Sequence, residues 1–359
     1  MLSYAGRNHR TVTLLKTIYF DRPDWTPAVV GLLPATWLKY RDALEALVLE
    51  HPKIWPGFKK GQHDYDTMWS PAYELGLHTD CWGCTWENVE RGMDSIVIGH
   101  PLEDWDHFKT WQPPDALTDN LFGKRDWDAE AARLAKDKAN GNLAMCGPVW
   151  HGFGYMLLYF LRGFENLMMD FAVEDPRLDE LVAIVTRYNA TATRKYLDLG
   201  AEYFTFGEDL GMQHALPISP ATWRRYIKPM YRTMFSPVVA ADLPIFLHSD
   251  GHILEIIPDL IEVGVKILNP QPRANGLANL AAVARGNVAL MQDCDRQLFP
   301  FATPSQLEDH ITEVHDTLYL PTGGLMLCVE CGPDVPLANI DALCKAVEKT
   351  CKLPEPDVV

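Results

Sequence analysis

The chain alternates between short apolar runs and longer stretches with a helical pattern, most regularly from about residue 142 onward. Each run is bounded by turn residues, and most runs end in Gly, Asp, His or Cys. Runs of this kind, alternating with helices, indicate parallel strands joined by helical crossovers. The runs are NLAMCGP (142–148), EYFTFGEDLG (202–211), PIFLHSDG (244–251), VKILNPQP (265–272), NVALMQDCD (287–295) and GLMLCVECG (324–332).

Two of the predicted helices have clear start signals. Asp175-Pro176 and Ser219-Pro220 each place an oxygen-bearing side chain directly before a proline. Such a side chain can cap the free N–H groups of the first turn, and proline fits the first helical position. Gly200 and Gly264 stand where a predicted helix ends before the next strand, as left-handed C-terminal caps would.

The first part of the chain, to about residue 141, is less regular. TPAVVGLL and SIVIGHP are predicted as strands, and the stretch of about 60–140 is predicted as an irregular, lid-forming insertion. Repeated strand–helix units over this length favour an α/β fold of the TIM (β/α)8 barrel type over an open doubly wound sheet. No glycine-rich phosphate loop follows a predicted strand, which argues against a nucleotide-binding open sheet. We therefore expect residues 1–359 to form one barrel domain.

Composition and charge exclude several classes of protein. The 359 residues carry a formal net charge of −16, which argues against binding to nucleic acid or to an anionic membrane surface. No apolar run approaches the ~20 residues that span a bilayer. The N-terminal segment lacks the layout of a secretory signal, so we expect a cytoplasmic protein whose eight cysteines are reduced.

In a barrel of this class, polar residues at the carboxyl ends of the strands form the active site. His248 and Asp250 lie two apart on one predicted strand, so their side chains share a face. Such a pair suits either metal binding or acid–base catalysis. The other reactive residues at predicted strand ends are Cys146, Glu208, Asp209, Asn269, Gln292–Asp295, Glu330 and Cys331.

A set of histidine, cysteine and carboxylate groups from separate strands is typical of a Zn²⁺ site. The sequence predicts His248, Cys331, Cys294 and Glu208 as candidate ligands. Each of these residues, taken alone, is more often a buried thiol or a hydrogen-bonded core side chain. Their common position at strand ends is what predicts a functional role.

Other reactive and aromatic residues give weaker signals. Cys81 and Cys84 of CWGC have no second CxxC or histidine pair, so we interpret them mainly as packing residues. His214 can contact a ligand or lie solvated in a loop. The aromatic stretch GFGYMLLYFLRGF (152–164) is predicted as a buried helix face, or alternatively as the wall of an apolar pocket.

Motifs spread over most of the chain resemble the uroporphyrinogen decarboxylase superfamily. They are DYDTMW, TDCWGCTW, GPVWHGFGYMLLYFLRGFENLMMDFAVEDP, GEDLGMQHALPISPATWRRYIKPMYR, LHSDGHILEIIPDLIEVGVKILNPQP and ECGPDVPLANI. The resemblance implies a TIM barrel, and the superfamily contains decarboxylases and corrinoid-linked methyltransferases. The arginine-rich N-terminal segment with which its decarboxylases grip substrate carboxylates has no counterpart here.

The zinc methyltransferases of the superfamily bind the metal through an HxC pair and a distant Cys-Gly. In this chain the first element is His248-Ser249-Asp250, with Asp in place of Cys, and the second is Cys331-Gly332. Replacing a thiolate by a carboxylate leaves zinc less electron-rich and a better Lewis acid. The change favours removal of a methyl group from an ether or alcohol oxygen over activation of a thiol.

The resemblance therefore predicts a corrinoid-dependent methyltransferase that demethylates a small substrate such as an aromatic methyl ether. A separate corrinoid protein would accept the methyl group, zinc would be bound by His248, Cys331 and either Asp250 or Glu208, and a homodimer is compatible with this scheme. Asp209, Asp250 and Glu330 are the predicted catalytic residues, which orient the ligands or protonate the leaving group. The predicted substrate-binding residues are Trp82, Trp150, Tyr155, His214 and Asn269.

Three alternatives remain open at the level of sequence. One is a thiol methyltransferase similar to the coenzyme M enzymes. Another is a metal-free lyase similar to uroporphyrinogen decarboxylase, in which Asp209 and Asp250 steer a pyrrole-like cation. The last is a binding protein without catalysis, which the retained polar residues at strand ends argue against.

Overall fold

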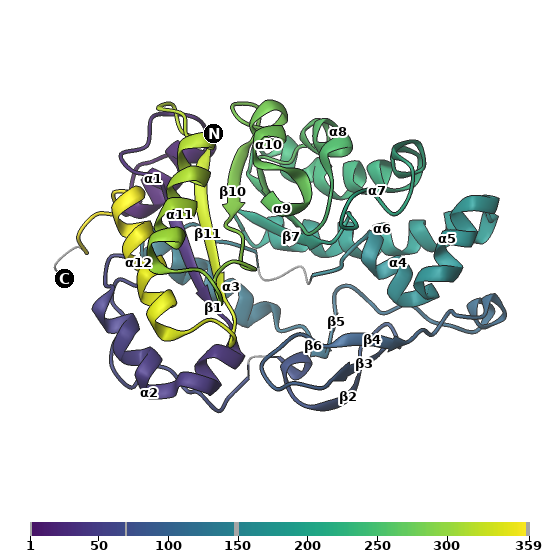
Figure 1. Cartoon of the computed structure of the whole chain (residues 1–359). Coiled ribbons are helices and arrows are strands. Elements are labelled where there is room, and N and C mark those ends of the chain that lie inside the picture. The colour runs from purple at the N-terminus through teal and green to yellow at the C-terminus, as the bar shows by residue number, and fades with distance from the viewer. Residues whose placement is uncertain (1, 69, 147–150, 357–359) are drawn as a thin grey trace. The chain divides into compact units, whose positions relative to one another are not determined.

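The computed structural model describes residues 2–68, 70–146 and 151–356 (Figure 1). Their contacts divide them into two compact units, and each unit is described by itself. The first unit contains the residues up to 12 together with 77–87 and 96–269. The second unit contains 13–76, 88–95 and the residues from 270 onward. Helix α1 (His9–Ile18) begins in the first unit and ends in the second.

Parallel strands form the centre of the first unit. β7 (Phe204–Glu208) pairs in parallel with β8 (Ile245–Ser249), and β9 (Ile267–Pro270) is the next strand beside β8. Every second side chain along β7 and β8 is buried, beginning with Phe204 and Phe206 in β7 and with Ile245 and Leu247 in β8. The strand predictions for 202–211, 244–251 and 265–272 are confirmed.

Two residues continue the sheet beyond β7. Met145 and His151 make parallel bridges to Tyr203 and Gly207. Gly207 also pairs with His248 of β8, so His151 lies on the opposite edge of β7. His151 is thereby placed level with the carboxyl end of β7.

The helices of the first unit begin where the sequence predicts. The Asp175 side chain accepts a hydrogen bond from the N–H of Arg177 at the start of α6 (Pro176–Asp198). The Ser219 hydroxyl accepts one from the N–H of Thr222 at the start of α7 (Pro220–Ala240). Gly200 and Gly264 adopt φ of 87° and 109°, the left-handed conformation that glycine adopts without a steric cost.

The remaining elements of the first unit are mostly short. They are β2 (Gly76–Thr79), β3 (Thr85–Asn88), β4 (Ile96–Gly99), η2 (Trp105–Lys109), β5 (Asp119–Asn120), β6 (Gly123–Lys124), α3 (Trp127–Ala139), α4 (Tyr155–Arg162), α5 (Phe164–Val173), η3 (Leu254–Ile256) and α8 (Ile257–Glu262). The first residue of β2 and the last residue of β3 fall in the second unit. α4, α5 and α6 lie close together in Figure 1.

The stretch of about 60–140 is more ordered than we expected. β2, β3 and β4 form a three-stranded sheet, and β5 pairs with β6 in a hairpin. Trp86 is buried at the centre of β3 opposite Val97 of β4, which gives this small sheet an apolar face. The strands are only two to four residues long, so their period-two signal is too short to stand out in the sequence.

An aromatic cluster packs β7 against α7. The rings of Phe153, Phe206, Tyr231 and Phe235 are buried, and neighbouring centroids lie 4.7 to 5.4 Å apart. Burying one side chain of this size stabilises a fold by about 2–3 kcal/mol. This core supports the segment between His151 and α4, and α4 itself is the buried helix that the aromatic stretch predicts.

The second unit has its own parallel strands and helices. β1 (Ala28–Leu32) and β10 (Ala289–Asp293) flank β11 (Leu325–Cys331) in parallel. TPAVVGLL, 287–295 and 324–332 are therefore confirmed as strands. The other elements of this unit are α2 (Pro34–Glu50), η1 (Pro71–Tyr73), α9 (Pro272–Asn275), α10 (Leu277–Val283), α11 (Pro304–Leu318) and α12 (Leu337–Thr350).

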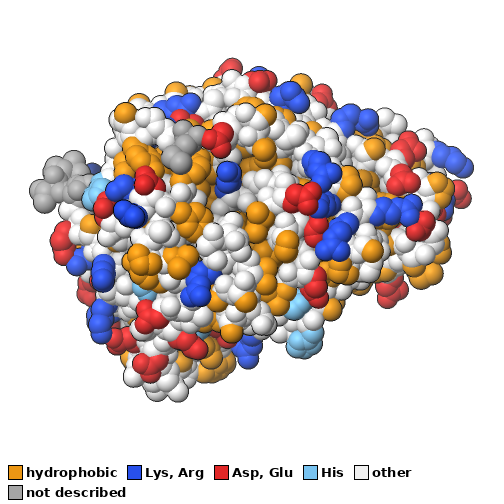
Figure 2. All heavy atoms as spheres, turned by 90° about the horizontal axis from the view of Figure 1, so that it is seen from above, with side chains coloured by type: hydrophobic (Ala, Val, Ile, Leu, Met, Phe, Trp, Pro, Cys, Tyr) orange, Lys and Arg blue, Asp and Glu red, His pale blue; other side chains and the backbone are white. Residues whose placement is uncertain are grey.

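No helix among the described residues has both the length and the apolar character needed to cross a membrane. On the face shown in Figure 2, acidic and basic side chains are interspersed. The net charge of −16 is therefore not gathered into one acidic patch on that face.

Candidate functional site

The site begins at the carboxyl end of β8 with His248. Its Nδ1 lies 2.7 Å from Oδ1 of Asn269 at the end of β9. An amide oxygen can only accept, so Nδ1 donates in this contact, and Nε2 is the ring nitrogen that faces the neighbouring carboxylates. Oδ1 of Asp250 lies 3.2 Å from that Nε2. Asn269 therefore fixes both the orientation and the tautomer of His248, as the hydrogen-bonding partners of metal-binding histidines do.

Asp209 follows the last residue of β7 and lies beside two histidines. Its Oδ1 is 3.0 Å from Nε2 of His151 and 3.9 Å from Nε2 of His248. Although Oδ1 is buried, it has no well-aligned hydrogen-bond partner among the described residues. Burial lowers the pKa of His151, but the Asp209 carboxylate raises it by more, so the net direction is upward. A positively charged group at this point would satisfy the carboxylate.

His151 is a site residue that the sequence analysis missed. Its backbone bridges Gly207, and a Cβ added to Gly207 would meet Nδ1 of His151 at 2.8 Å. A larger residue at this position would therefore push the imidazole from the place it occupies. The side chain is 49% exposed, and its ring centroid lies 5.4 Å from that of His248. The available signal was a histidine three residues after the run 142–148, in the motif GPVWHG.

Glu208, the last residue of β7, is fully buried and anchors the start of α4. Its carboxylate accepts hydrogen bonds from the N–H groups of Gly154 and, at 2.9 Å, Met156. The N-cap residue of α4 is Gly154, which has no side chain to do this. Burial raises the pKa of Glu208 to about 8, although the two N–H groups lower it. Glu208, predicted as a metal ligand, is thus engaged with backbone N–H groups.

Two glycines hold the loops that follow β7 and β8 in contact. A Cβ on Gly251 would lie 2.0 Å from the carbonyl oxygen of Gly211, so the two backbones touch. The N–H of Gly211 donates to the carbonyl of Asp250 at 3.3 Å, and the N–H of His252 donates to that of Met212 at 2.8 Å. This contact fixes the loops that carry Asp209 and Asp250.

Together these residues fit a divalent metal ion. One ligand atom from each of His151, Asp209 and His248 lies within 4.8 Å of the others, which is the spacing of donors around one ion. Imidazole and carboxylate are both ordinary zinc ligands. The buried Asp209 oxygen that lacks a hydrogen bond supports the same fit.

Several residues predicted to bind substrate lie away from this cluster. Trp82 is buried, stacks on Trp111 and packs against the tilted ring of Tyr188. Tyr155 is buried in the first turn of α4, and His214 is exposed in a loop after β7. Asn269 contacts His248, as described above. Trp150 lies outside the described residues. The roles of these residues in substrate binding remain predictions.

The motif DCWGCTW has a structural explanation. The buried Asp80 carboxylate accepts hydrogen bonds from the N–H groups of Trp82 and Cys84, each at 2.9 Å, and from Nε1 of Trp86 at 2.8 Å. The motif therefore folds into a tight turn around one carboxylate. Cys84 is fully buried, in agreement with a packing role.

The predicted residues Cys294, Glu330 and Cys331 belong to the second unit. Cys331 ends β11, and its carbonyl accepts a hydrogen bond from the Thr36 hydroxyl at 2.8 Å. Burial raises the pKa of the Cys331 thiol to about 12, and that of the Cys294 thiol well above its usual range. Glu330 makes an ion pair with Arg296 at 2.5 Å. Metal binding by the two cysteines and catalysis by Glu330 remain predictions.

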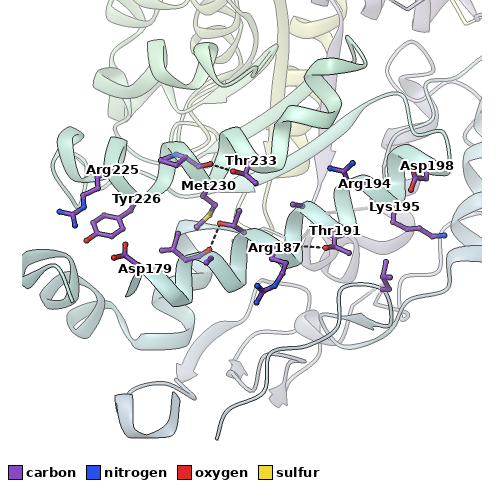
Figure 3. A pocket seen from close by; sticks show the side chains of 16 residues that line it. Asp179, Arg187, Thr191, Arg194, Lys195, Asp198, Arg225, Tyr226, Met230 and Thr233 are labelled. Atoms are coloured by element: carbon purple, nitrogen blue, oxygen red, sulfur yellow. Dashed lines mark hydrogen bonds between the residues drawn. The ribbon is translucent and has the colours of Figure 1, made fainter. Parts of the chain in front are cut away.

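A separate groove of about 760 Å³ lies on the outer surface of α6 and α7 (Figure 3). Its floor includes Ala183, Ala190 and Met230, and Arg187 and Arg194 lie along it. None of the clustered residues His151, Asp209 and His248 lines it. The groove is thus distinct from the candidate metal site, which is built from strand ends.

Comparison with known families agrees with this architecture. The family Uroporphyrinogen decarboxylase (URO-D) matches residues 77–350, so the chain belongs to this family. Membership confirms the predicted α/β fold of the TIM-barrel type. A search of curated proteins finds no match by sequence.

Two solved structures are similar to this chain at low sequence identity. A methyltransferase from Methanosarcina mazei is 16% identical, with a TM-score of 0.59, over 95% of this chain and 98% of that chain. A B12-independent methionine synthase from Shewanella sp. W3-18-1, in complex with selenomethionine, is 10% identical, with a TM-score of 0.35, over 48% of this chain and 54% of that chain. The first comparison, with a TM-score above 0.5 and 16% identity, bears on the fold alone, and no conclusion is drawn from the second.

Proposed function

We propose that the protein is a corrinoid-dependent methyltransferase that takes a methyl group from an oxygen of a small substrate, such as an aromatic methyl ether. The observation that carries the proposal is the His248–Asp250 pair at the end of β8, with Nε2 of His248 3.2 Å from Oδ1 of Asp250 and Nδ1 held by Asn269. This is the position of the HxC pair in the zinc methyltransferases of the superfamily. The similarity in fold to the Methanosarcina mazei methyltransferase supports the same class of reaction.

Zinc, when bound, supplies a Lewis acid that polarises the leaving oxygen. His248 is a ligand in this scheme, and Asn269 orients its imidazole. Asp250, 3.2 Å from Nε2 of His248, would take up a proton from solvent and donate it to the oxygen as the O–CH3 bond breaks and the methyl group leaves. Trp82, Trp150 and Tyr155 remain the proposed wall of the methyl donor's pocket. The acceptor is the cobalt of a corrinoid carried by a separate protein.

The test is a methyl transfer assay with purified protein, cob(I)alamin and a panel of methoxylated aromatics, alcohols and thiols. Formation of methylcobalamin is followed by its visible spectrum. We expect transfer from an ether, and at least a hundredfold loss for His248→Ala. His107→Ala, which removes an exposed histidine of η2, is the matched control and should transfer normally. Transfer from a thiol alone would reverse the assignment of substrate, and no transfer from any donor would contradict the proposal.

A decarboxylase is the second candidate, because the matching family is named for uroporphyrinogen decarboxylase. In this reaction Asp209 and Asp250 would steer a pyrrole-like cation without a metal. Decarboxylation of a cyclic tetrapyrrole by protein freed of metal would favour this candidate over methyl transfer.

The proposal includes the compartment in which the protein works and the partner protein that it works with. None of the eight cysteines forms a disulfide. Reduced thiols are the ordinary state in the cytoplasm, where we propose that the protein works with its corrinoid partner.

A further inference from the structure

We infer that the metal ion of this site is bound by His151, Asp209 and His248, a nitrogen and oxygen ligand set without a thiolate. The inference rests on the proposed function for the identity of the reaction, but the metal site itself is argued from geometry alone. The sequence predicts a set that includes Cys331 and Cys294. The inferred set contains no cysteine and adds His151.

The convergence of three side chains on one point is the first argument. Oδ1 of Asp209 lies 3.0 Å from Nε2 of His151 and 3.9 Å from Nε2 of His248. Both imidazoles thus present the same kind of nitrogen to a single carboxylate oxygen. Bound to one ion, the three atoms would form a two-histidine, one-carboxylate set, which is a common arrangement in catalytic metal sites.

The incompletely satisfied oxygen of Asp209 is the second argument. Its Oδ1 is buried and has no well-aligned hydrogen bond among the described residues, although Nε2 of His151 lies 3.0 Å away. A contact that is not well aligned offsets only part of the cost of burying a carboxylate oxygen, which is about 1–3 kcal/mol when no partner is present. Coordination to a divalent ion removes that cost, because the ion does not need the alignment that an N–H donor needs.

The way His151 is held is the third argument. Gly207 leaves space for its ring, and the N–H of Gly152 donates to the carbonyl of Gly207 at 2.8 Å. Glu208 then fixes the next residues through the N–H groups of Gly154 and Met156. Every one of these contacts comes from β7, the strand that leads directly into Asp209. His151 and Asp209 are therefore built as one rigid pair, as metal ligands require.

The composition of the set limits the chemistry. The cysteines of the first unit, Cys81, Cys84 and Cys146, are not part of the cluster. Two neutral imidazoles and one carboxylate leave an ion less electron-rich than a thiolate set does. Such an ion polarises a hard oxygen donor and is poorly suited to activating a thiol. The inferred substrate class is therefore an oxygen-bound methyl donor.

The test measures binding of the metal alone. Metal-stripped protein is titrated with Zn²⁺ by calorimetry and with Co²⁺ by visible and near-ultraviolet absorption. We expect one equivalent of metal and a Co²⁺ spectrum without a thiolate-to-metal charge-transfer band. His151→Ala, His248→Ala and Asp209→Ala should each weaken binding at least tenfold. His107→Ala and Asp128→Asn, which change exposed or partly exposed side chains elsewhere in the first unit, are the matched controls.

Cys331→Ser separates this set from the one that the sequence predicts. We expect it to bind Co²⁺ as the unchanged protein does. A thiolate charge-transfer band in the unchanged protein would overturn the inference even if the variant failed to fold. Unweakened binding by folded His151→Ala, or no metal binding at all, would overturn it as well. Metal binding as inferred, without methyl transfer to cob(I)alamin, would contradict the proposed function and leave the metal site standing.

Discussion

Oδ1 of Asp209 lies 3.0 Å from Nε2 of His151, although the two residues belong to different segments of the chain. The contact exists because the backbone of His151 bridges Gly207, two residues before Asp209 in the sequence. Parallel pairing thus sets a histidine and a carboxylate side by side at the carboxyl edge of β7. The predictions below test how this arrangement is supported.

Asn269→Ala is expected to weaken zinc binding by about 10- to 100-fold, because a hydrogen-bonding partner that orients a metal-binding histidine contributes this much. The Nδ1 of His248 would lose its acceptor at 2.7 Å, and the ring could rotate or change tautomer. Asn269→Asp keeps an acceptor oxygen and should retain most of the affinity. Competition with a chromophoric chelator gives the constants. Equal affinities for Asn269→Ala and the unchanged protein would show that Asn269 does not orient His248.

Glu208→Ala is expected to lower the free energy of unfolding by several kcal/mol. It leaves the N–H groups of Gly154 and Met156 without an acceptor in the core, at about 1–3 kcal/mol each. Glu208→Gln keeps one oxygen acceptor and should lose less. Urea denaturation followed by circular dichroism measures both. If the two variants were equally stable, the carboxylate would not be serving as the cap of α4.

Gly251→Ala is expected to destabilise the protein by more than about 2 kcal/mol. The new Cβ would lie 2.0 Å from the carbonyl oxygen of Gly211, at a backbone φ of 80° that disfavours side chains. Gly6→Ala is the matched control, since Gly6 also has a positive φ of 76° but no atom within 4 Å of an added Cβ. The control should show only the cost of a left-handed alanine, about 1–2 kcal/mol. Thermal unfolding gives the loss of stability of each variant. The additional loss in Gly251→Ala is the cost of the steric contact with Gly211.

Asp175→Ala is expected to destabilise the protein by about 1 kcal/mol at neutral pH, through loss of the N-cap of α6. The effect should depend on pH, because hydrogen bonding to Arg177 lowers the pKa of Asp175 to about 2 from its ordinary 3.8. Between about pH 2 and pH 3.8, the folded state therefore binds fewer protons than the unfolded state. Its stabilising contribution is complete above pH 3.8 and is lost as the pH falls through about 2.

Asp175→Asn is the control for that pH dependence. It keeps an oxygen that can cap α6 but removes the charge, so its stability should be less sensitive between pH 4 and pH 2 than that of the unchanged protein. Chemical denaturation across this range gives the comparison. A parallel decline of the two proteins would mean that Asp175 does not contribute through its charge.

The sequence by itself determined the α/β class, most of the strands of the parallel sheets, and the starts of α6 and α7. These features depend on local patterns: apolar runs between turn residues, and oxygen side chains before Pro176 and Pro220. It also placed His248, Asp250 and Asp209 at strand ends, because the end of a strand can be read from the run that precedes it.

Only the tertiary structure decided which groups meet. His151 reaches the site because its backbone pairs with Gly207. The residues of the two segments do not by themselves show that these segments will pair. Glu208 caps a helix instead of facing the site, since its neighbours in space are the N–H groups of Gly154 and Met156. Local patterns determine where an element begins and ends, but lateral register and burial, which depend on the whole fold, decide which side chains lie close together.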